Sequence, residues 1–334
     1  MINIAQIGCG YWGPNLLRNL DANPGCTVRM VCDQSEERRQ YVKQRYSYVD
    51  TCDTVDSIFE NPDIDAVILA TPVALHYDQA IRALKAGKHI MVEKPMARSC
   101  KEVEHIAALA REKELVAMAG HTFLYNDAVL YLKDLINSGE LGDILYIYSQ
   151  RLNLGRIRAD VDALWNLAPH DISIIQYLLG DPEPASVTRA GMDFMQNGVD
   201  DVVFMNIMYP GKAMAHVHVS WLDPNKVRKL TVVGSKKMAV YDDMAAEKIT
   251  LFDKGIDRVE SKMDFDEQDF FAFNHRSGDI VMPKVQFSEP LKIEVEHFLA
   301  CIRGDEQCRT DANHALNVVR ILEMGSEACG GDDA

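Results

Sequence analysis

The sequence of 334 residues contains no long apolar run and no CxxC pair of cysteines. No apolar stretch approaches the roughly 20 residues that a transmembrane helix needs, so we expect no membrane span. The chain opens on an apolar strand pattern and not on the charged and apolar segments of a signal peptide. The eight cysteines are scattered, which favours free thiols in a reducing cytoplasm over a disulfide framework.

Positive charge is also scarce. The 35 lysines and arginines are outnumbered by 50 aspartates and glutamates, giving a formal net charge of −15. This balance argues against a general nucleic-acid or anionic-membrane binder, so we expect neither as a partner. If the substrate is itself an anion, the positive charge that binds it must be gathered locally. The sequence also contains no internal repeat and no low-complexity segment.

The most informative segment is the glycine-rich turn near the N-terminus. An apolar run over residues 2–7 meets Gly8–Gly13, and leucines at helical spacing follow, which predicts a strand, a tight turn and a helix. In such a GxGxxG turn Gly8 makes the turn, Gly10 lets the backbone approach a pyrophosphate, and Gly13 lets the helix pack closely on the strand. The helix N-terminus directs free N–H donors at the phosphates.

A carboxylate follows the second predicted strand. The apolar run Thr27–Cys32 ends at Asp33, twenty residues after Gly13. An aspartate at this place can accept hydrogen bonds from both ribose hydroxyls of an adenosine and would repel a 2′-phosphate. We therefore predict a dinucleotide site that takes NAD rather than NADP. The alternative for Asp33 is a turn carboxylate at a strand end.

Strands and helices alternate over residues 1–122. This alternation implies right-handed crossovers and a doubly wound parallel sheet, that is, an NAD-binding Rossmann domain. Ligands of such a sheet lie at the carboxyl ends of its strands. The segments that fall at these ends are Gly8–Gly13, Asp33, Thr71, Lys94 and His121.

Beyond Asn126 the pattern changes to short strands joined by turns, which predicts a mostly antiparallel sheet. The predicted strands are 144–148, 201–210, 213–221, 228–233, 238–241 and 249–252. The predicted helices are 128–136, Asp171–Leu179, 291–301 and 312–324, with a loop from Asp253 to Pro290.

The predicted fold class is therefore α/β, with a Rossmann parallel sheet followed by an α+β domain whose mostly antiparallel sheet is open on one face. The second domain is predicted to cover 123–334 and to bind the substrate. An exposed sheet face this broad usually needs covering, so we expect a homodimer or homotetramer that forms through it.

Taken together, these residues resemble one known family, the Gfo/Idh/MocA oxidoreductases, over essentially the whole chain. The matching motifs are Gly8-Cys9-Gly10-Tyr11-Trp12-Gly13, Asp33, Thr71-Pro72 with His76, Glu93-Lys94-Pro95, Asn166-Leu167-Ala168-Pro169-His170 and Glu289-Pro290-Leu291. The resemblance implies a nicotinamide cofactor and the oxidation or reduction of a sugar or cyclitol hydroxyl. The cofactor-binding residues that it implies are Gly8, Gly10, Tyr11, Trp12, Gly13, Asp33, Thr71, Pro72, His76, Glu93 and Lys94.

Oxidation of a secondary alcohol needs a base for the hydroxyl proton and a cation or donor that steadies the developing alkoxide. Lys94 and His170 are the catalytic candidates. Lys94 ends a strand at the ligand edge of the sheet, where an ammonium could hydrogen-bond the substrate oxygen. His170 has an imidazole that titrates near neutrality, so it can take the proton. Glu93 either orients Lys94 or contacts cofactor, and a structural salt bridge is the alternative.

Substrate binding is predicted for residues on both sides of the domain boundary. Arginine side chains bind diphosphate oxygens in bidentate fashion, although a solvated edge is the alternative for Arg151, Arg156 and Arg158. Tyr125 follows the last Rossmann strand. The full predicted set is Lys94, Tyr125, Arg151, Arg156, Asn166 and His170.

Asn166 departs from the family pattern, because many relatives carry an aspartate four residues before the histidine. This departure puts in doubt any scheme that needs an Asp–His relay. Asp171 could partly replace the missing carboxylate, but we favour helix N-capping as its role. His216 and His218 share one strand face with no third ligand in the sequence, so no metal site is predicted.

The segments Arg151–Gly155 and Leu164–Asp171 are similar to the branch that acts on nucleotide-linked amino sugars, in particular the UDP-N-acetylglucosamine 3-dehydrogenases. The predicted function is NAD-dependent oxidation of the 3-hydroxyl of UDP-N-acetylglucosamine to a ketone. An aminotransferase would consume this UDP-sugar product on the way to a surface polysaccharide or lipopolysaccharide. The alternatives are an inositol or free-sugar dehydrogenase, a sugar-nucleotide ketoreductase, and a non-catalytic NAD(P)-sensing regulator.

Overall fold

The computed structural model describes residues 1–159, 161–261 and 270–328. The chain forms two compact units: one comprises Met1–Asn126 and Ser288–Glu323, and the other comprises Asp127–Phe287 and the residues from Met324 onward. The segment Ser288–Glu323 therefore contacts mainly the N-terminal unit, although the sequence analysis assigned it to the range 123–334. The division of cofactor and substrate binding between two domains stays a prediction.

The first unit is built on a six-stranded sheet in the order β3-β2-β1-β4-β5-β6, and all of its strand pairs are parallel. The strands are β1 (Ile2–Ile7), β2 (Cys26–Cys32), β3 (Asp50–Cys52), β4 (Ala66–Leu69), β5 (His89–Glu93) and β6 (Ala117–Gly120). The order runs outward in opposite directions from β1 and β4. The carboxyl ends of β1 and β4 therefore flank the switch point, which is where ligands bind in such sheets.

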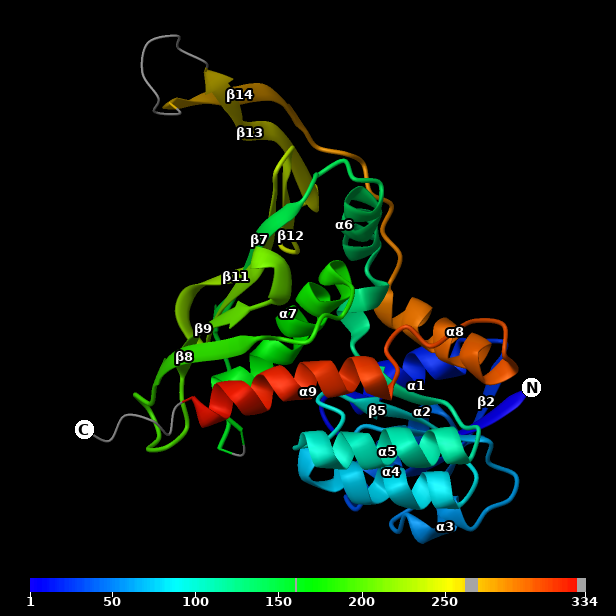
Figure 1. Cartoon of the computed structure of the whole chain (residues 1–334). Coiled ribbons are helices and arrows are strands. Elements are labelled where there is room, and N and C mark those ends of the chain that lie inside the picture. Colours follow the sequence, from blue (N-terminus) through cyan, green and yellow to red (C-terminus); the bar gives the residue numbers. More distant parts are fainter. Residues whose placement is uncertain (160, 262–269, 329–334) are drawn as a thin grey trace. The chain divides into compact units, whose positions relative to one another are not determined.

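Helices cover this sheet on both faces, because right-handed crossovers that run in opposite directions place their helices on opposite faces. The helices are α1 (Gly13–Asp21), α2 (Glu36–Arg45), α3 (Asp56–Phe59), α4 (His76–Lys85), α5 (Cys100–Glu112), α8 (Pro290–Arg303) and α9 (Ala312–Glu327), with the short 3-10 helices η1 (Val73–Leu75) and η2 (Thr122–Tyr125). Figure 1 shows α4 beside α5 and α1 beside α8, and these pairs are in contact. The parallel sheet predicted for this part of the chain is confirmed.

The second unit is built on an eight-stranded sheet in the order β14-β13-β12-β11-β7-β10-β9-β8. Its elements are α6 (Asp127–Asn137), β7 (Ile144–Leu154), α7 (Ala163–Leu179), β8 (Ser186–Met192), β9 (Val202–Met208), η3 (Pro210–Lys212), β10 (Met214–Ser220), β11 (Leu222–Gly234), β12 (Met238–Asp242), β13 (Ile249–Ser261) and β14 (Phe270–Val281). Among the described strands of this sheet only β7 and β10 pair in parallel, so the predicted mostly antiparallel sheet is confirmed.

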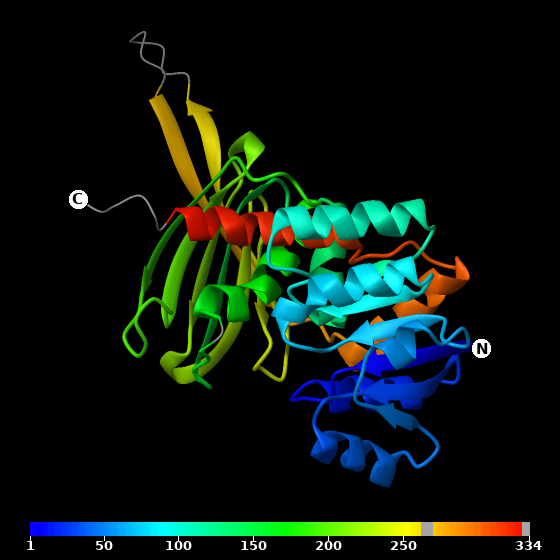
Figure 2. The ribbon, with the colours of Figure 1, turned by 90° about the horizontal axis from the view of Figure 1, so that it is seen from below.

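Helix α7 packs against β7, β9 and β10 and covers one face of this sheet (Figure 2). Period-two alternation buries one set of side chains under α7, for example Met205, Ala215 and Val217. The opposite face carries exposed apolar and aromatic side chains. We call this surface the open face and define it by Tyr146, Tyr148, Phe204, Met208 and Met214, together with His216 and His218.

Two predicted elements were wrong in extent, and one strand was not predicted. The helix predicted at Asp171–Leu179 begins at Ala163, because Asp162 caps it by accepting a hydrogen bond from the Trp165 backbone N–H at 2.8 Å. Pro169 lies inside this helix, before the predicted start at Asp171.

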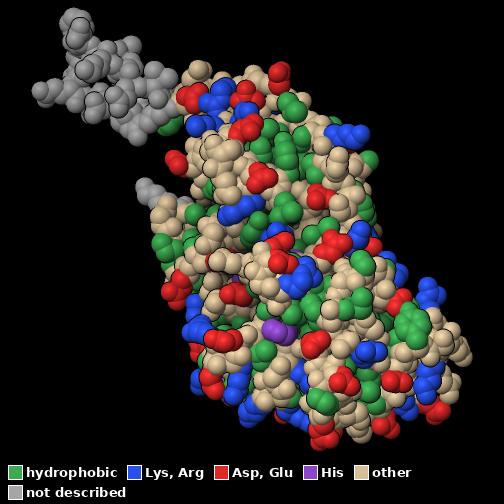
Figure 3. Space-filling view, turned by 90° about the vertical axis from the view of Figure 1, so that its right-hand side faces the viewer, with side chains coloured by type: hydrophobic (Ala, Val, Ile, Leu, Met, Phe, Trp, Pro, Cys, Tyr) green, Lys and Arg blue, Asp and Glu red, His purple; other side chains and the backbone are tan. Residues whose placement is uncertain are grey.

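The predicted loop from Asp253 to Pro290 is largely strand, since β13 continues to Ser261 and β14 pairs antiparallel with it. Strand β8 was not predicted. No helix within the described ranges combines the length and apolar composition that crossing a bilayer requires. On the face displayed in Figure 3, acidic and basic side chains are interspersed and neither sign forms a continuous field.

Candidate active site

A buried glutamine supports the glycine-rich turn. Gln6 is fully buried in β1, and its Nε2 donates hydrogen bonds to the carbonyl oxygens of Gly8 at 2.8 Å and Gly13 at 3.0 Å. Gly8 has a φ of +94°, and a Cβ there would lie 2.5 Å from the Ala70 carbonyl oxygen. A Cβ at Gly13 would lie 2.6 Å from the Gly8 carbonyl oxygen. Both positions therefore require glycine.

The surface beside the turn is open at Gly10, where a Cβ would meet nothing within 4 Å. Asp33 lies next to it at the end of β2, where its Oδ2 accepts a hydrogen bond from the Cys9 N–H at 2.7 Å. Its Oδ1 accepts one from the Ser35 N–H at 2.9 Å. Each carboxylate oxygen has a second lone pair, so the half-buried Asp33 can brace the turn and still accept ribose hydroxyls. The arrangement fits an adenine dinucleotide.

A histidine braces the next two strand ends. His76 is 1% exposed; its Nδ1 lies 2.9 Å from the Pro95 carbonyl oxygen and its Nε2 lies 2.8 Å from that of Thr71. The ring thus joins the end of β4 to the segment after β5. The Thr71 hydroxyl donates to Gln79 at 2.7 Å. The structure gives His76 this bracing role, while contact of His76, Thr71 and Pro72 with the cofactor stays a prediction.

Glu93 ends β5 with a carboxyl group in an unusual environment. Its Oε1 is buried and has no hydrogen-bond partner among the described residues. Burial raises the pKa of Glu93 to about 7, although Lys94 and a hydrogen bond from Trp12 act in the opposite direction. A Cβ at Gly120 would lie 3.3 Å from this oxygen, so the glycine leaves room for the carboxyl group. A buried acceptor without a partner at a strand end fits a ligand-binding role.

Two further ionisable groups lie around Lys94 and Glu93. His121 follows β6 and is 2% exposed; burial lowers its pKa well below the usual value, and His314 and Lys94 act in the same direction. Glu294 in α8 is fully buried and accepts a hydrogen bond from the Thr122 hydroxyl at 2.7 Å. Burial raises its pKa well above the usual value, and the charge of Glu93 adds to this.

The first unit thus brings together Lys94, Glu93, His121 and Glu294 at the ends of β5 and β6 and on α8. The sequence analysis named the first three but missed Glu294. Perturbed pKa values that cluster at strand ends are typical of functional sites. The sequence signal that could have indicated Glu294 is the Glu289-Pro290-Leu291 motif, because a helix begins there and carries Glu294 in its first turns.

Tyr125 lies in the core of the first unit. It is 0% exposed, its hydroxyl lies 3.0 Å from Thr310 Oγ1, and its ring contacts His297 and Arg309. Its burial and these contacts show that Tyr125 packs in the core of the first unit. Its predicted contact with substrate stays a prediction.

His170 and Asn166 belong to the second unit. Both are half-buried on α7, where a spacing of four residues places them on the same helix face. His170 lies near the middle of the helix, whereas the predicted helix began one residue after it, and its carbonyl oxygen accepts a hydrogen bond from the Ser173 hydroxyl at 2.9 Å. The meeting of His170 with Lys94 over one substrate stays a prediction.

Arg151 and Asp171 form a buried ion pair between β7 and α7. The Arg151 Nε donates to the Asp171 Oδ2 at 2.6 Å, and the two side chains are 7% and 4% exposed. The predicted N-capping role of Asp171 is wrong, because Asp162 is the cap. The solvated-edge alternative is also wrong for Arg151, whereas Arg156 is exposed after β7. Phosphate binding by Arg151 and Arg156 stays a prediction.

Comparison with known proteins identifies the family. A family model described as oxidoreductase family, NAD-binding Rossmann fold, matches residues 2–121, and the GFO/IDH/MocA C-terminal domain matches residues 129–240. The chain belongs to the Gfo/Idh/MocA oxidoreductase family. The predicted family and the predicted NAD cofactor are confirmed, and the glycine turn with Asp33 lies in the range that the NAD-binding model matches.

Relatives within the family have diverse activities. The 2,7-anhydro-N-acetylneuraminate hydratase of Mediterraneibacter gnavus is 28% identical over 62% of this chain and 58% of its own. The chain spans about three fifths of the length of this and similarly matched curated relatives. The scyllo-inositol 2-dehydrogenase (NAD(+)) of Bacillus subtilis is 26% identical over 98% of this chain and 93% of its own.

A solved structure of the UDP-N-acetylglucosamine 3-dehydrogenase from Acidithiobacillus ferrooxidans resembles the fold with a TM-score of 0.82. The match covers 98% of this chain and 97% of that one at 21% identity, so it concerns the fold alone.

Proposed function

We propose that the protein is an NAD-dependent dehydrogenase that oxidises the 3-hydroxyl of UDP-N-acetylglucosamine to a 3-keto sugar. The observation that carries an alcohol oxidation is the position of Lys94, which follows β5 in an NAD-binding sheet beside Glu93 and His121. The amino-sugar substrate is supported by the motif around Asn166 and His170 and by the likeness in fold to a UDP-N-acetylglucosamine 3-dehydrogenase.

The bound nicotinamide would accept the hydride in this reaction. Lys94 would hydrogen-bond the substrate oxygen and stabilise the charge that develops there as the C–H bond breaks. His170 would take the hydroxyl proton, and Asn166 on the same helix face would position the sugar. His121 is disfavoured as an imidazolium by its burial, so it would not compete with Lys94 as the cation. Arg151 and Arg156 are the proposed contacts of the diphosphate.

The direct test is to incubate the purified protein with NAD and UDP-N-acetylglucosamine and to follow NADH absorbance, with mass spectrometry of the nucleotide sugar. NADH and a product lighter by two hydrogens are expected. A parallel reaction contains a keto-acid acceptor, or an aminotransferase that removes the ketone, because an unfavourable equilibrium would otherwise hide turnover. If neither NADH nor ketone forms in either reaction, the substrate assignment is wrong.

An inositol or free-sugar dehydrogenase is the second candidate. It is favoured by the scyllo-inositol 2-dehydrogenase of Bacillus subtilis, which aligns with this chain over nearly its whole length. Turnover of inositols or free sugars at higher kcat/KM than UDP-N-acetylglucosamine would select this candidate. A ketoreductase would instead show faster turnover from NADH and a 3-keto nucleotide sugar.

We further propose that the protein acts in the cytoplasm as a homodimer or homotetramer, and that an aminotransferase consumes its ketone for a surface polysaccharide or lipopolysaccharide. The seven described cysteines form no disulfide, which suits a reducing compartment. The open face supports oligomerisation, because contiguous exposed apolar side chains mark association surfaces.

A further inference from the structure

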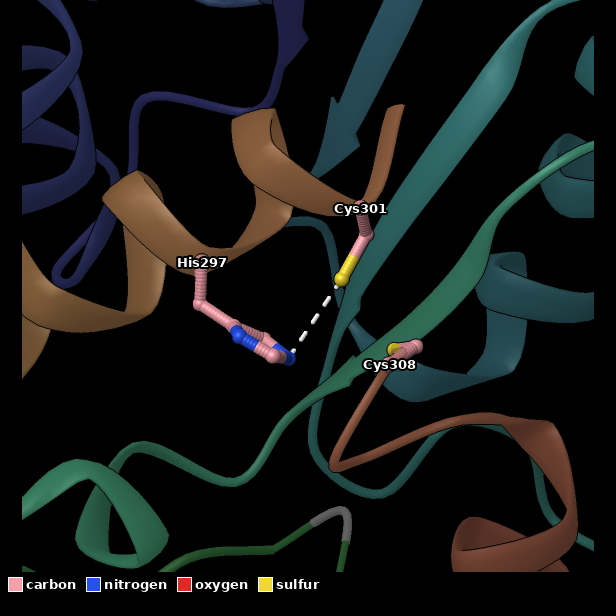
Figure 4. Close-up of side chains that lie close together, drawn as sticks. All are labelled: His297, Cys301 and Cys308. Atoms are coloured by element: carbon pink, nitrogen blue, oxygen red, sulfur yellow. Dashed lines mark hydrogen bonds between the residues drawn. The ribbon is translucent and has the colours of Figure 1, made fainter. Parts of the chain in front are cut away.

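Three potential metal ligands converge at the end of α8. His297 and Cys301 lie one helical turn apart on α8, and Cys308 lies on the loop that leads to α9, with all three side chains directed toward one another (Figure 4). Their ligand atoms lie within 4.8 Å of one another, and the His297 Nε2 lies 3.4 Å from the Cys301 Sγ. In the described part of the chain this is the one group of three or more such residues that could hold an ion.

The spacing fits a tetrahedral zinc ion. Zinc binds imidazole nitrogen at about 2.0 Å and thiolate sulfur at about 2.3 Å, so a tetrahedral angle separates the two ligand atoms by roughly 3.5 Å. The observed separation of 3.4 Å between Nε2 and Sγ matches this value. Thiolate and imidazole together select zinc over magnesium or calcium, which prefer oxygen ligands.

Glu306 orients the histidine for such a role. Its Oε2 lies 2.6 Å from the His297 Nδ1, so the carboxylate accepts a hydrogen bond from Nδ1 and leaves Nε2, 3.4 Å from the Cys301 Sγ, as the acceptor nitrogen. This is the carboxylate–histidine arrangement that usually supports a zinc-bound imidazole. The Arg309 backbone N–H donates to the same Nε2 at 2.9 Å. Ion binding would therefore replace one hydrogen bond from a loop residue.

The two cysteines are accessible to an ion from a neighbouring cavity. A cavity of about 260 Å³ is lined by Cys301, Cys308, Glu306 and Asp311. It gives an ion a route to the two sulfur atoms and leaves space for a water molecule as fourth ligand.

A bound ion would stabilise the packing of the loop between α8 and α9 against the edge of the parallel sheet. This loop already pairs with β6, since the Ala119 N–H donates to the Thr310 carbonyl oxygen at 2.7 Å and the Thr310 hydroxyl donates to the Ala119 carbonyl oxygen at 2.8 Å. Strand β6 leads directly to His121. An ion at this place would stabilise the strand end that carries part of the candidate active site.

We propose that His297, Cys301 and Cys308 bind one zinc ion, with Glu306 as the hydrogen-bond partner of the histidine and water as the fourth ligand. The site is structural, and none of its residues is proposed to take part in hydride transfer. Its test therefore uses metal binding and stability, and it stands whether or not UDP-N-acetylglucosamine is the substrate.

The experiment is a cobalt and zinc titration of the full chain, reduced and freed of metal by a chelator. We expect one equivalent of Co²⁺ to give the intense visible bands of a tetrahedral site and a sulfur-to-cobalt charge-transfer band, which Zn²⁺ then abolishes. Cys301→Ser and Cys308→Ser should each reduce the charge-transfer band and weaken binding. Glu306→Gln should keep the spectrum and weaken zinc binding about 10- to 100-fold. Zinc should raise the Tm of the wild type.

Cys100→Ser is the matched control, because Cys100 is a half-buried cysteine of the same unit outside the cluster. It should bind cobalt like the wild type.

The proposal is overturned if the reduced wild type binds no cobalt at one equivalent, or if both serine variants bind it unchanged. It is also overturned if Cys301 and Cys308 form a disulfide on oxidation while the reduced protein takes up no metal. Circular dichroism of each variant separates loss of binding from loss of fold, and Glu306→Gln changes a half-exposed side chain that does not disturb the core.

Discussion

Arg151 in β7 and Asp171 in α7 form a buried ion pair in which Nε and Oδ2 are 2.6 Å apart. The pair lies next to His170 in sequence and fixes the helix that carries it to the sheet beneath. Because both charges are withdrawn from water, each depends on the other for compensation. This relationship suggests that the pair positions the proposed base, in addition to any contact that Arg151 makes with substrate.

Asp171→Asn should destabilise the second unit strongly. The substitution leaves the Arg151 guanidinium buried without its carboxylate, and breaking such a pair costs on the order of 3–5 kcal/mol. Urea unfolding followed by circular dichroism measures the loss. Glu296→Gln is the control, since Glu296 makes an exposed i,i+4 pair with Lys292 that should contribute roughly 0.5 kcal/mol or less. Equal losses in the two variants would contradict the role assigned to the buried pair.

Lys94→Ala should reduce kcat by about a hundredfold or more while NAD binding persists, because the ammonium acts on the substrate oxygen and the glycine turn holds the cofactor. Steady-state kinetics and a fluorescence titration with NADH give the two quantities. Lys101→Ala changes an exposed lysine at the start of α5 and should leave both unchanged. An unaffected kcat in Lys94→Ala would remove this residue from the mechanism.

Asp33→Ala should weaken NAD binding roughly 10- to 100-fold, since hydrogen bonds to a charged group contribute about 1.5–3 kcal/mol. It should also narrow the preference for NAD over NADP, because the repulsion of a 2′-phosphate is removed. Calorimetric titration with both cofactors measures the change. Asp53→Ala, at an exposed position after β3, serves as the control. Retained discrimination in Asp33→Ala would show that another group selects the cofactor.

Glu93 should make folding stability fall as pH rises through neutrality. Its pKa is raised to about 7 in the folded protein from 4.5, so the folded state holds a proton that the unfolded state has released between these values. Stability is fully present below pH 4.5 and is lost as pH approaches and passes 7. His121 acts with the opposite sign, because its pKa is lowered from 6.5 in the folded state.

The difference in unfolding free energy between wild type and Glu93→Gln, measured from pH 5 to about pH 8, isolates the glutamate. Relative to the glutamine variant, the wild type should lose stability over this range. A difference that stays constant with pH would show that the Glu93 carboxyl group does not titrate there.

Phe204→Glu should dissociate the proposed oligomer. Phe204 lies on β9 within the open face, is 44% exposed, and stacks on His218 with ring centroids 4.1 Å apart. A charge there would have to be buried on association. Light scattering after size-exclusion chromatography measures the mass. Leu75→Glu changes a similarly exposed residue, 45% exposed, in the other unit and should leave the mass unchanged. A wild type that elutes as a monomer would contradict association through this face.

The parallel sheet and its glycine turn could be predicted from sequence because their signals are local. An apolar run, a glycine at each tight contact and a carboxylate at the next strand end identify β1, α1 and β2 without reference to the rest of the chain. The start of α7 could not be predicted in this way. Pro169 is a common start signal, and only the hydrogen bond from Trp165 to Asp162 shows that the helix begins earlier.

Features that depend on distant partners were also missed. Asp171 has the local pattern of a capping residue, yet its role is set by Arg151, which lies twenty residues away. The raised pKa of Glu294 results from its burial and from the nearby charge of Glu93, and its carboxylate accepts a hydrogen bond from Thr122. His297 and Cys301 have the i,i+4 spacing of two ligands on one helix face, which could have been noticed, but Cys308 joins them only because the loop turns back.

The position of Gln6 has a consequence for how fast the cofactor can bind. Because one amide group holds two carbonyl groups of the turn, their peptide planes are fixed before any nucleotide arrives. The pyrophosphate then binds to a turn that is already ordered, so little conformational entropy of the main chain is lost on binding. A dinucleotide can accordingly bind and leave without a folding step at the phosphate end.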